Sequence, residues 1–354
     1  MNIAIVIPTI EAGGAEKQAV LLAKCLSVSH QVFFYIFFGD LPKEQKHIDV
    51  LDAAGVKYLS LTGSTIKKTR ALTRSLIEKR IAVAFNYLTM CDGAGCYAER
   101  KAGVKFIFNG IRNAHLALWK EVIERYCNNH WATGTIFNSY SAEKFFAIRG
   151  FKKERLIVIP NCFQEIAPTV IREDAEFKTI ITVGRFDSAK DYETSIKTVA
   201  AVYSKNPKVR YRIVGYGVLE PKIRQWIEQY GIQDITDIFI NPSNIPELLQ
   251  KSDVFLTTSL YEGTSNAVME ALNASLPVVC TRVGDNEYLV KNGQSGYVHN
   301  VGDVESLSDS LLKILSNYEL RQSFGKVANQ NLRENYSIET FAKRYNALLE
   351  QCKL

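Results

Sequence analysis

The chain alternates short runs of β-branched and aromatic residues with longer stretches of helical periodicity. In the first half the strand-like runs lie at 3–8, 31–38, 81–87, 105–109, 135–139 and 156–161, with helical stretches such as 16–26 and 116–126 between them. Strands that alternate with helices predict parallel sheets with crossover connections. The same plan starts again at 178–185 and continues to 277–281. We therefore expect an α/β fold with two doubly wound, Rossmann-like sheets.

The length and the least periodic segment predict where the two domains meet. A chain of 354 residues exceeds the usual size of one domain. Residues 160–178 carry two prolines and an acidic cluster, so they are the best candidate linker. We expect domains at 1–163 and 164–337 that face a cleft, with ligands at the carboxyl ends of the strands. A last helix near 339–351 follows Ser337, a suitable N-cap, and could pack on either domain.

The composition indicates an ordinary globular protein. The chain is 47% apolar and 23% charged, and no apolar run approaches the ~20 residues that span a bilayer. The N-terminus MNIAIVIPTI has the pattern of a first strand and not of a signal peptide. The seven cysteines are scattered; Cys91 and Cys96 are close but have no second pair. These features favour reduced structural thiols, no metal site and a cytoplasmic location.

The net charge of +6 is distributed unevenly. Residues 1–163 carry 22 Lys and Arg against 13 Asp and Glu, or +9, whereas 164–354 carry 21 against 24, or −3. This asymmetry indicates that the N-terminal half meets something acidic, such as a phosphate or a membrane surface.

The densest basic segment is STIKKTRALTRSLIEKR, residues 64–80. Its cations are interleaved with apolar side chains, and they are Lys67, Lys68, Arg70, Arg74, Lys79 and Arg80. A basic amphipathic helix of this kind can lie on an anionic membrane. The alternative is a crossover helix with a solvated basic face.

Two turns between a strand and a helix carry residues suited to bind an anion. In PTIEAGGAEKQ, Gly13 and Gly14 precede a helix, where free amides favour an anion, although close packing explains such a pair as well. In ITVGRFDSAKDYETSIK, Arg185 and Lys190 could converge on a diphosphate, or could be ordinary surface charges. Gly215, in IVGYGVLE, could equally be a simple turn residue.

A third turn, YEGTSNAVMEAL (261–272), places two glutamates around the start of a helix. Thr264 or Ser265 would cap this helix and leave the next three amides without intrahelical partners. Those amides form an anion site, which two bare carboxylates would repel. Glu262 and Glu270 fit if each accepts hydrogen bonds from hydroxyl groups that flank a diphosphate, as in a sugar nucleotide. The alternative is a solvated Glu270 and a loop residue Glu262.

With these motifs, the chain resembles the family-4 retaining glycosyltransferases of GT-B fold nearly end to end. The resemblance lies in GGAEKQ, IPN (159–161), VGRF…K, IVGYGVLE and, above all, the two glutamates seven residues apart in YEGTSNAVMEAL. It implies that the N-terminal domain takes the acceptor, that the C-terminal domain binds the donor, and that the last helix (338–354) returns to the N-terminal domain.

The resemblance also implies roles for individual residues. Arg185 and Lys190 would neutralise the donor diphosphate, Glu270 would hold the ribose, and Glu262 would face the transferred sugar. The implied donor-binding set is Gly14, Arg185, Lys190, Gly215, Glu262, Gly263, Ser265, Asn266, Ala267, Val268 and Glu270. The implied catalytic residues are Glu262, Arg185, Lys190 and Asn113, and the implied acceptor-side residues are Arg112 and His115. No cofactor is implied, and the chain has no Asp-x-Asp triplet for a metal.

The sequence departs from the family pattern at several positions. Arg112-Asn113 stands where many members have a histidine, and His115 lies just beyond. Thr264 replaces a common proline, Cys162 a common glycine, and Asn241 a frequent glycine near the expected base pocket. These changes affect the identity of the donor more than the class of reaction.

We therefore expect a retaining, metal-independent glycosyltransferase that uses a nucleotide sugar, with UDP favoured by family frequency. The acceptor would be a glycan or a lipid-linked saccharide. The protein could work at the inner face of the membrane, through peripheral contact with anionic lipid. One alternative is a UDP-sugar 2-epimerase of GT-B fold. Another is a basic protein that binds a polymer, against which no nucleic-acid recognition motif occurs.

Overall fold

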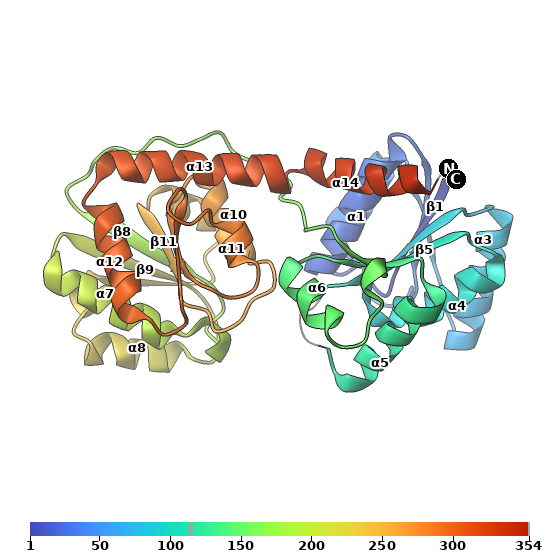
Figure 1. Ribbon diagram of the computed structural model, residues 1–354, viewed down its shortest axis with the longest axis horizontal. Helices are drawn as coiled ribbons and strands as arrows, with labels where there is room; N and C mark the ends of the chain where they lie inside the picture. The colour runs from blue at the N-terminus through green and yellow to red at the C-terminus, as the bar shows by residue number, and fades with distance from the viewer. Residues whose placement is uncertain (113–115, 353–354) are drawn as a thin grey trace. The chain divides into compact units, whose positions relative to one another are not determined.

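The computed structural model describes residues 1–112 and 116–352. Its contacts divide the chain into an N-terminal unit, residues 1–162 with the segment from Ile338 onward, and a C-terminal unit, Phe163–Ser337 (Figure 1). Ser337 alone separates two helices, because one ends at Tyr336 and the next begins at Ile338. Asn113 and His115 lie outside the described residues.

In the described part of the N-terminal unit, seven parallel strands form one sheet in the order β3-β2-β1-β4-β5-β6-β7. The strands are β1 (Asn2–Ile7), β2 (Gln31–Ile36), β3 (Lys57–Ser60), β4 (Val83–Asn86), β5 (Phe106–Ile111), β6 (Gly134–Phe137) and β7 (Leu156–Val158). The central strands β1 and β4 are buried along their length, since helices cover both faces of a parallel sheet.

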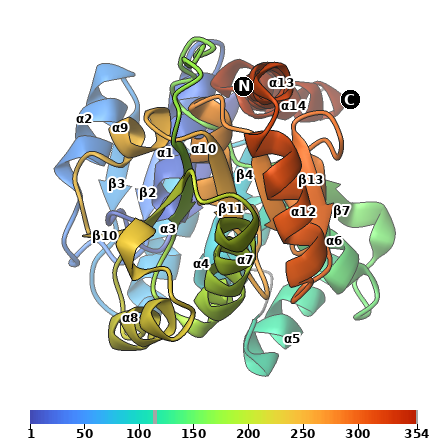
Figure 2. The same ribbon diagram turned by 90° about the vertical axis from the view of Figure 1, so that its left-hand side faces the viewer.

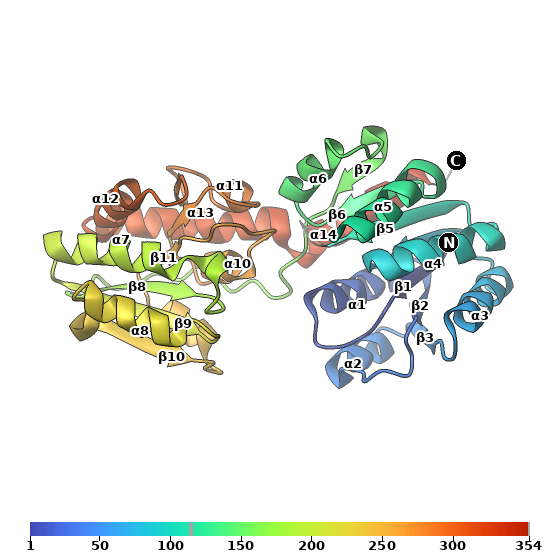
Figure 3. The ribbon, with the colours of Figure 1, turned by 90° about the horizontal axis from the view of Figure 1, so that it is seen from below.

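The helices of the N-terminal unit pack on both faces of this sheet. One core joins the sheet to α1 (Gly14–Ser27), α2 (Gln45–Ala53) and α14 (Ile338–Gln351). The opposite core joins it to α3 (Thr65–Glu78) and α4 (Leu88–Ala102). Beside α4 lies α5 (Leu118–Tyr126), which continues into the π-helical turn η1 (Cys127–Trp131), and Figure 3 shows α3 and α4 together. The remaining elements are α6 (Tyr140–Ala147) and η2 (Lys153–Arg155).

In the described C-terminal unit, six parallel strands follow the order β10-β9-β8-β11-β12-β13. They are β8 (Lys178–Val183), β9 (Val209–Gly215), β10 (Thr236–Ile240), β11 (Val254–Thr257), β12 (Val278–Thr281) and β13 (Gly296–His299). The two units thus repeat one plan, and the predicted α/β class with two doubly wound sheets is confirmed.

Helices cover both faces of the second sheet as well. One core includes α7 (Tyr192–Lys205), α8 (Glu220–Gln229) and α12 (Val304–Leu315), and Figure 2 shows α7 and α12 side by side. The other core includes α9 (Ile245–Gln250), α10 (Asn266–Asn273) and α11 (Asn286–Leu289), with the last turns of α13 (Tyr318–Tyr336). Two 3-10 turns, η3 (Ser188–Lys190) and η4 (Gln233–Ile235), complete the unit.

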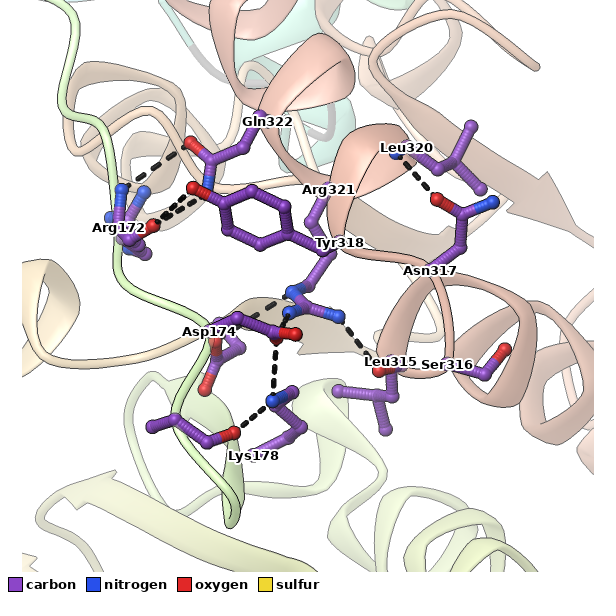
Figure 4. A network of polar contacts seen from close by, with 12 residues as sticks. Arg172, Asp174, Lys178, Leu315, Ser316, Asn317, Tyr318, Leu320, Arg321 and Gln322 are labelled. Carbon is purple, nitrogen blue, oxygen red and sulfur yellow. Dashed lines mark hydrogen bonds and ion pairs between the residues drawn. The ribbon is translucent and has the colours of Figure 1, made fainter.

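The segment expected to be a linker is fastened to the C-terminal unit. The carbonyl of Arg172 accepts hydrogen bonds from the Tyr318 hydroxyl and the Gln322 amide, both at 3.0 Å (Figure 4). Asp174 is ion-paired with the buried Arg321. This segment therefore belongs to the wall of one unit and is not a free connection.

Two elements of the N-terminal unit did not follow from the sequence pattern. β3 is largely exposed, so it lacks the buried apolar alternation that marks a strand. α4 contains CDGAGC, whose glycines have low helix propensity, yet Cys91 and Cys96 are buried against the sheet. Tertiary packing decides the structure of both segments.

Among the described residues, every helix is too short or too polar to cross a bilayer.

Candidate active site

The site in the C-terminal unit lies where the strand order reverses. β8 pairs with β9 on one side and with β11 on the other, so the chain leaves these strands in opposite directions. Ligands of open α/β sheets bind at the carboxyl ends of the strands at such a point. Arg185 and Lys190 follow β8, and Glu262 follows β11, so this edge of the sheet carries three of the predicted residues.

Lys190 and Glu262 are in direct contact. The Lys190 ammonium is ion-paired with Glu262 Oε1, and the Ser259 hydroxyl donates a hydrogen bond to the same oxygen at 2.8 Å. Only 18% of the Lys190 side chain and 12% of the Glu262 side chain are exposed. The structure thus brings together the residue predicted to bind phosphate and the residue predicted to face the sugar.

Backbone contacts hold the two loops that carry these residues. The Thr258 hydroxyl donates to the carbonyl of Asp191 at 2.8 Å, and the Leu260 amide donates to the carbonyl of Ala189 at 2.8 Å. Asp191 has a φ of +46° and caps α7 by accepting from the Thr194 amide. The position of Lys190 is therefore fixed from both strands of the switch point.

The loop after β12 packs directly on the Glu262 loop. Gly284 has a φ of +53°, and a Cβ there would lie 2.4 Å from the carbonyl oxygen of Gly263 and 2.6 Å from that of Glu262. The neighbouring Asp285 accepts a hydrogen bond from the Thr264 hydroxyl at 3.3 Å, and its own amide donates to Gly263 at 3.0 Å. Thr264, which replaces a common proline, is thus held by a buried carboxylate.

α10 presents its N-terminus at this site. Ser265 is the N-cap residue and is buried. Its side chain makes no capping hydrogen bond, so the serine stands at the expected N-cap position without the expected contact. Its carbonyl accepts from the Met269 amide at 3.1 Å. The amides of Asn266, Ala267 and Val268 belong to the first turn, where a helix leaves its N–H groups without intrahelical partners. They favour an anion at that end.

Glu270 lines a cavity of about 320 Å³ on the side of α10. The wall also includes Pro246 and Leu249 of α9 and Phe163 at the start of the unit. Asn273, one helical turn after Glu270, lines the same cavity and accepts a hydrogen bond from the Ala167 amide at 2.8 Å. Glu270 therefore lines a largely apolar cavity and is not a helix residue that faces only solvent.

Arg185 lies on the outside of the same loop. Its side chain is 73% exposed, and its guanidinium lies 3.4 Å from the carboxylate of Asp187. An exposed pair of this kind is weak and easily exchanged for another anion. Arg185 is thus a candidate to bind a diphosphate beside Lys190, because its exposed guanidinium can exchange Asp187 for another anion.

Two positions near the predicted base pocket have structural explanations. A Cβ at Gly215 would lie 1.9 Å from the carbonyl oxygen of Gly184, so glycine is required there by the close approach of β8 and β9. Asn241 has a φ of +44°, and its amide donates to Gly215 at 3.0 Å. Asparagine tolerates this left-handed conformation better than most residues, so it can replace the frequent glycine.

In the N-terminal unit, Gly13 is the N-cap of α1 and Gly14 its first residue. The Glu16 carboxylate bends back over this end: a Cβ at Gly13 would lie 2.1 Å from Glu16 Oε2, and the Thr9 hydroxyl donates to Glu16 Oε1 at 2.9 Å. The anion preference of this helix end is therefore partly met by the chain itself. Around Gly14 a Cβ would meet open space.

Arg112 follows β5 and contacts two tyrosines. Its guanidinium lies 4.3 Å from the ring centre of Tyr87, and Nη2 donates to the Tyr345 hydroxyl of α14 at 3.3 Å. Its Nε and Nη1 atoms are buried and have no hydrogen-bond partner among residues 1–112 and 116–352. Arg112 is thus held rigidly at the carboxyl end of the first sheet.

Gly284 and Asp285 shape the Glu262 loop, yet neither is predicted from the sequence as a site residue. The only signal was the pair Gly-Asp in TRVGDN directly after a buried strand. Such a pair marks a turn, but nothing in it shows which other loop the turn contacts.

Comparisons with known proteins find similarity to glycosyltransferases. Residues 163–331 match the family model described as glycosyl transferases group 1. The match covers most of the unit that carries Lys190, Glu262 and Glu270. The resemblance to glycosyltransferases inferred from the sequence is confirmed.

Relatives and solved structures extend this result along the chain. A poly(ribitol-phosphate) alpha-N-acetylglucosaminyltransferase of Staphylococcus aureus is 22% identical over 92% of this chain and 68% of its own length. A GalNAc-alpha-(1->4)-GalNAc-alpha-(1->3)-diNAcBac-PP-undecaprenol alpha-1,4-N-acetyl-D-galactosaminyltransferase of Campylobacter jejuni is 24% identical over 100% of this chain and 99% of its own.

The similar solved structures include HepE of Anabaena in complex with UDP, with a TM-score of 0.83 and 17% identity over 99% of this chain and 100% of that one. The lipopolysaccharide outer core galactosyltransferase WaaB in its apo form has a TM-score of 0.82 and 16% identity, over 99% of each chain. At this level of identity the structures establish the fold, which is GT-B. Together with the family match, they support glycosyltransferase activity.

Proposed function

We propose that this chain is a retaining glycosyltransferase that moves a sugar from a UDP-sugar to a glycan or a lipid-linked saccharide. The observation that carries the proposal is the Lys190–Glu262 contact at the topological switch point, beside the N-terminus of α10. A ligand seated there meets a cation, a carboxylate and free helix amides within one edge of the sheet. That combination suits a sugar joined to a diphosphate.

The proposed chemistry depends on stabilising the leaving group. When the anomeric C–O bond breaks, negative charge develops on the nucleotide diphosphate. Lys190, Arg185 and the first amides of α10 would stabilise that charge, as preorganised donors do in many transferases. These groups supply the positive charge that a divalent metal provides elsewhere, so we propose that transfer needs no metal and proceeds undiminished in EDTA.

The two glutamates have separate proposed roles. Glu262, next to Lys190, would face the transferred sugar, and its ion pair holds the carboxylate in one orientation. Glu270 would accept hydrogen bonds from the ribose hydroxyls, since it lines the cavity beside α10. The rest of that cavity is largely apolar, as the flat face of a nucleotide base requires.

Retention of configuration follows if the departing phosphate acts as the base. The acceptor oxygen forms its bond to the anomeric carbon on the face from which the phosphate leaves. The phosphate oxygen, released as the C–O bond breaks, takes the proton of the acceptor hydroxyl. This route requires no enzymic nucleophile. Proton NMR of the product, which reports the anomeric configuration, tests it.

The donor and acceptor classes are supported by similarity. HepE was crystallised in complex with UDP and, in a second structure, with UDP-glucose. The names of the Staphylococcus aureus and Campylobacter jejuni relatives include a ribitol-phosphate polymer and a PP-undecaprenol compound. We propose by analogy that the acceptor here bears phosphate, which fits the +9 balance of residues 1–163.

Peripheral contact with an anionic membrane at the cytoplasmic face is part of the same proposal, and the N-terminal unit offers a surface for it. A groove between α3 and α4 is lined by Arg70, Arg74 and Lys101 together with Ile77 and Tyr97. All five side chains are exposed. Lysine and arginine beside exposed apolar and aromatic groups are typical of surfaces that bind anionic lipid.

Two details refine this surface. Lys68, counted among the basic residues of the stretch, is buried with its ammonium 4.5 Å from the ring centre of Phe38, so it does not face lipid. α5, which packs beside α4, exposes Leu118 by 75% and Trp119 by 60%. We name Arg70, Arg74, Lys101 and Tyr97 the basic-aromatic face.

A panel of nucleotide sugars tests the function. We expect UDP to raise the melting temperature of the chain more than GDP does, because a ligand that binds the folded state stabilises it. We then expect one UDP-sugar to be hydrolysed slowly without acceptor. Formation of a C2 epimer of the donor would support the epimerase instead. No stabilisation by any nucleotide, with salt-sensitive binding to polyanions, would support the polymer-binding protein.

A further inference from the structure

Three carboxyl groups of α4 and α5 lie buried in the N-terminal unit. Asp92 and Glu99 of α4 are 0% exposed, and Glu124 of α5 is 1% exposed. No ion pair joins them to a lysine or arginine within the part of the chain that the structure describes. Three ionised carboxylates in such a place would be unfavourable by many kcal/mol, so some of them must carry protons.

The contacts of Asp92 tie it to the end of β5. Its Oδ1 accepts a hydrogen bond from the Gly110 amide at 3.0 Å, and its backbone carbonyl accepts from the Asn109 side chain at 3.4 Å. Asn86 of β4 donates both to Glu99 Oε2 at 2.9 Å and to Asn109 at 3.2 Å. This network reaches two residues short of Arg112.

Asp92 also contacts Glu124 carboxyl to carboxyl. No N–H group of the described residues donates to either oxygen of Glu124 or to Oδ2 of Asp92. Two carboxyl groups attract each other only when one of them carries a proton and donates it to the other, as in an aspartic-protease dyad. A hydrogen bond between them therefore requires one shared proton.

We propose that Asp92 and Glu124 share one proton, and that this pair positions the end of β5 and the Arg112 guanidinium. Glu124 is the donor and Asp92 the carboxylate, which keeps one negative charge beside Gly110 and toward Arg112. Glu124 is thus a positioning residue, which acts through Asp92. Its importance for transfer rests on the proposed acceptor role of Arg112.

The surroundings place the proton on Glu124. Burial raises the pKa of Glu124 well above its usual range, and the nearby Asp92 raises it further. Burial raises the pKa of Asp92 as well, but the Gly110 amide and the Arg112 charge oppose that effect. Within the described residues, the other groups that face the pair are Thr89, Glu99, and the thiols of Cys91, Cys96 and Cys127.

Difference infrared spectroscopy tests the proton directly. A protonated carboxyl has a carbonyl stretch separate from that of a carboxylate. We expect the Glu124→Gln spectrum at pH 7 to lack one such band of the parent, while the contribution of Glu99 cancels in the difference. Glu121→Gln is the matched control on the same helix: Glu121 is ion-paired with Arg149 at 2.9 Å and lies outside the pair, so this variant should keep the parent band. Loss of no band in Glu124→Gln would overturn the proposal.

The positioning role has its own readout, which needs no substrate. With ¹⁵N-labelled arginine, the Arg112 Nε–H resonance is identified by its absence in Arg112→Lys. Glu124→Gln can still donate to Asp92, so we expect this resonance to stay in place, whereas Glu124→Ala should shift or broaden it. An unchanged resonance in Glu124→Ala, in a variant that still melts cooperatively, would overturn the role.

These outcomes are independent of the enzymatic activity. If the band and the resonance behave as expected but no nucleotide sugar is turned over, the proposed function fails and the carboxyl pair stands. If transfer is found, Glu124→Ala should lower it about tenfold, roughly 1.4 kcal/mol in the barrier, while Glu124→Gln keeps it near the parent rate.

Discussion

The Lys190 ammonium and the Glu262 carboxylate form an ion pair across the switch point of the second sheet, although 72 residues separate them in the sequence. Both side chains are mostly buried, and the Ser259 hydroxyl completes the contact. Because each residue orients the other, a substitution of either one should also change the position of its partner. The ion pair links the sugar side of the proposed donor site to its phosphate side.

Lys190→Ala should lower the rate of glycosyl transfer by about 10²–10³-fold, the usual effect of removing one preorganised group that stabilises a leaving charge. Rates with the donor identified from the panel give the measurement. Lys197→Ala is the matched control, since Lys197 is ion-paired with Glu193 on the exposed side of α7 and should change the rate little. Equal rates for the two variants would contradict a role for Lys190.

Gly284→Ala should reduce both stability and transfer, because its Cβ would clash with the Gly263 and Glu262 carbonyls. Gly293 has a similar positive φ of +74° but open space around it, so Gly293→Ala introduces only the left-handed strain of about 1–2 kcal/mol. Thermal melts and transfer rates of the two variants isolate the effect of the clash. Similar activity in both would show that the Gly284 loop does not hold Glu262 in place.

Stability should fall as the pH rises toward 8 because of Glu99. Burial raises the pKa of Glu99 to about 8, with the Asn86 side chain opposing the shift and Asp92 adding to it. A carboxyl whose pKa is raised in the folded state contributes stability below its unfolded pKa, near 4.5, and loses it as the pH rises through about 8.

Glu99→Gln should remove this dependence, so its melting temperature should fall less than that of the parent between pH 6 and 9. We take melts across that range for Glu99→Gln and for the exposed control Glu154→Gln. Parallel curves for the parent and both variants would show that Glu99 does not titrate as we infer.

The basic-aromatic face should bind vesicles that contain anionic lipid. Arg70, Arg74 and Lys101 replaced together by alanine should weaken binding by about 100-fold, since each cation near the surface contributes about 1 kcal/mol. The control replaces Lys24, Lys46 and Lys57, which are exposed and remove the same charge elsewhere on the unit. Co-sedimentation that is equally weakened in both, or insensitive to salt and to anionic lipid, would contradict the face.

Much of the fold could be predicted because strand and helix periodicities are local. The predicted helix 16–26 lies within α1, and the predicted helix 116–126 contains the whole of α5. The strand order is not local: nothing between 178 and 259 shows that β8 and β11 are neighbours, and that neighbourhood creates the site. Likewise, the sequence suggests cations and carboxylates one by one, but the Lys190–Glu262 contact appears only in three dimensions.

The burial of polar side chains was harder to predict from the sequence than the strands and helices. Carboxylate residues in a helix usually face solvent, so the sequence gives no sign that Asp92, Glu99 and Glu124 are buried. Their burial is seen only once the helices pack on the sheet. Glu16 gave no signal that it would bend over the start of α1. Polar residues are buried when specific partners surround them, and those partners come from distant parts of the chain.

The division of roles between Glu262 and Glu270 is the central claim, and paired titration and turnover measurements test it most directly. For Glu262→Ala we expect the loss of transfer with UDP binding largely kept. For Glu270→Ala we expect UDP binding to weaken by about 10–100-fold, the value of a charged hydrogen bond. The exposed Glu228→Ala serves as control. Parent-like UDP affinity and parent-like transfer in both glutamate variants would contradict the account.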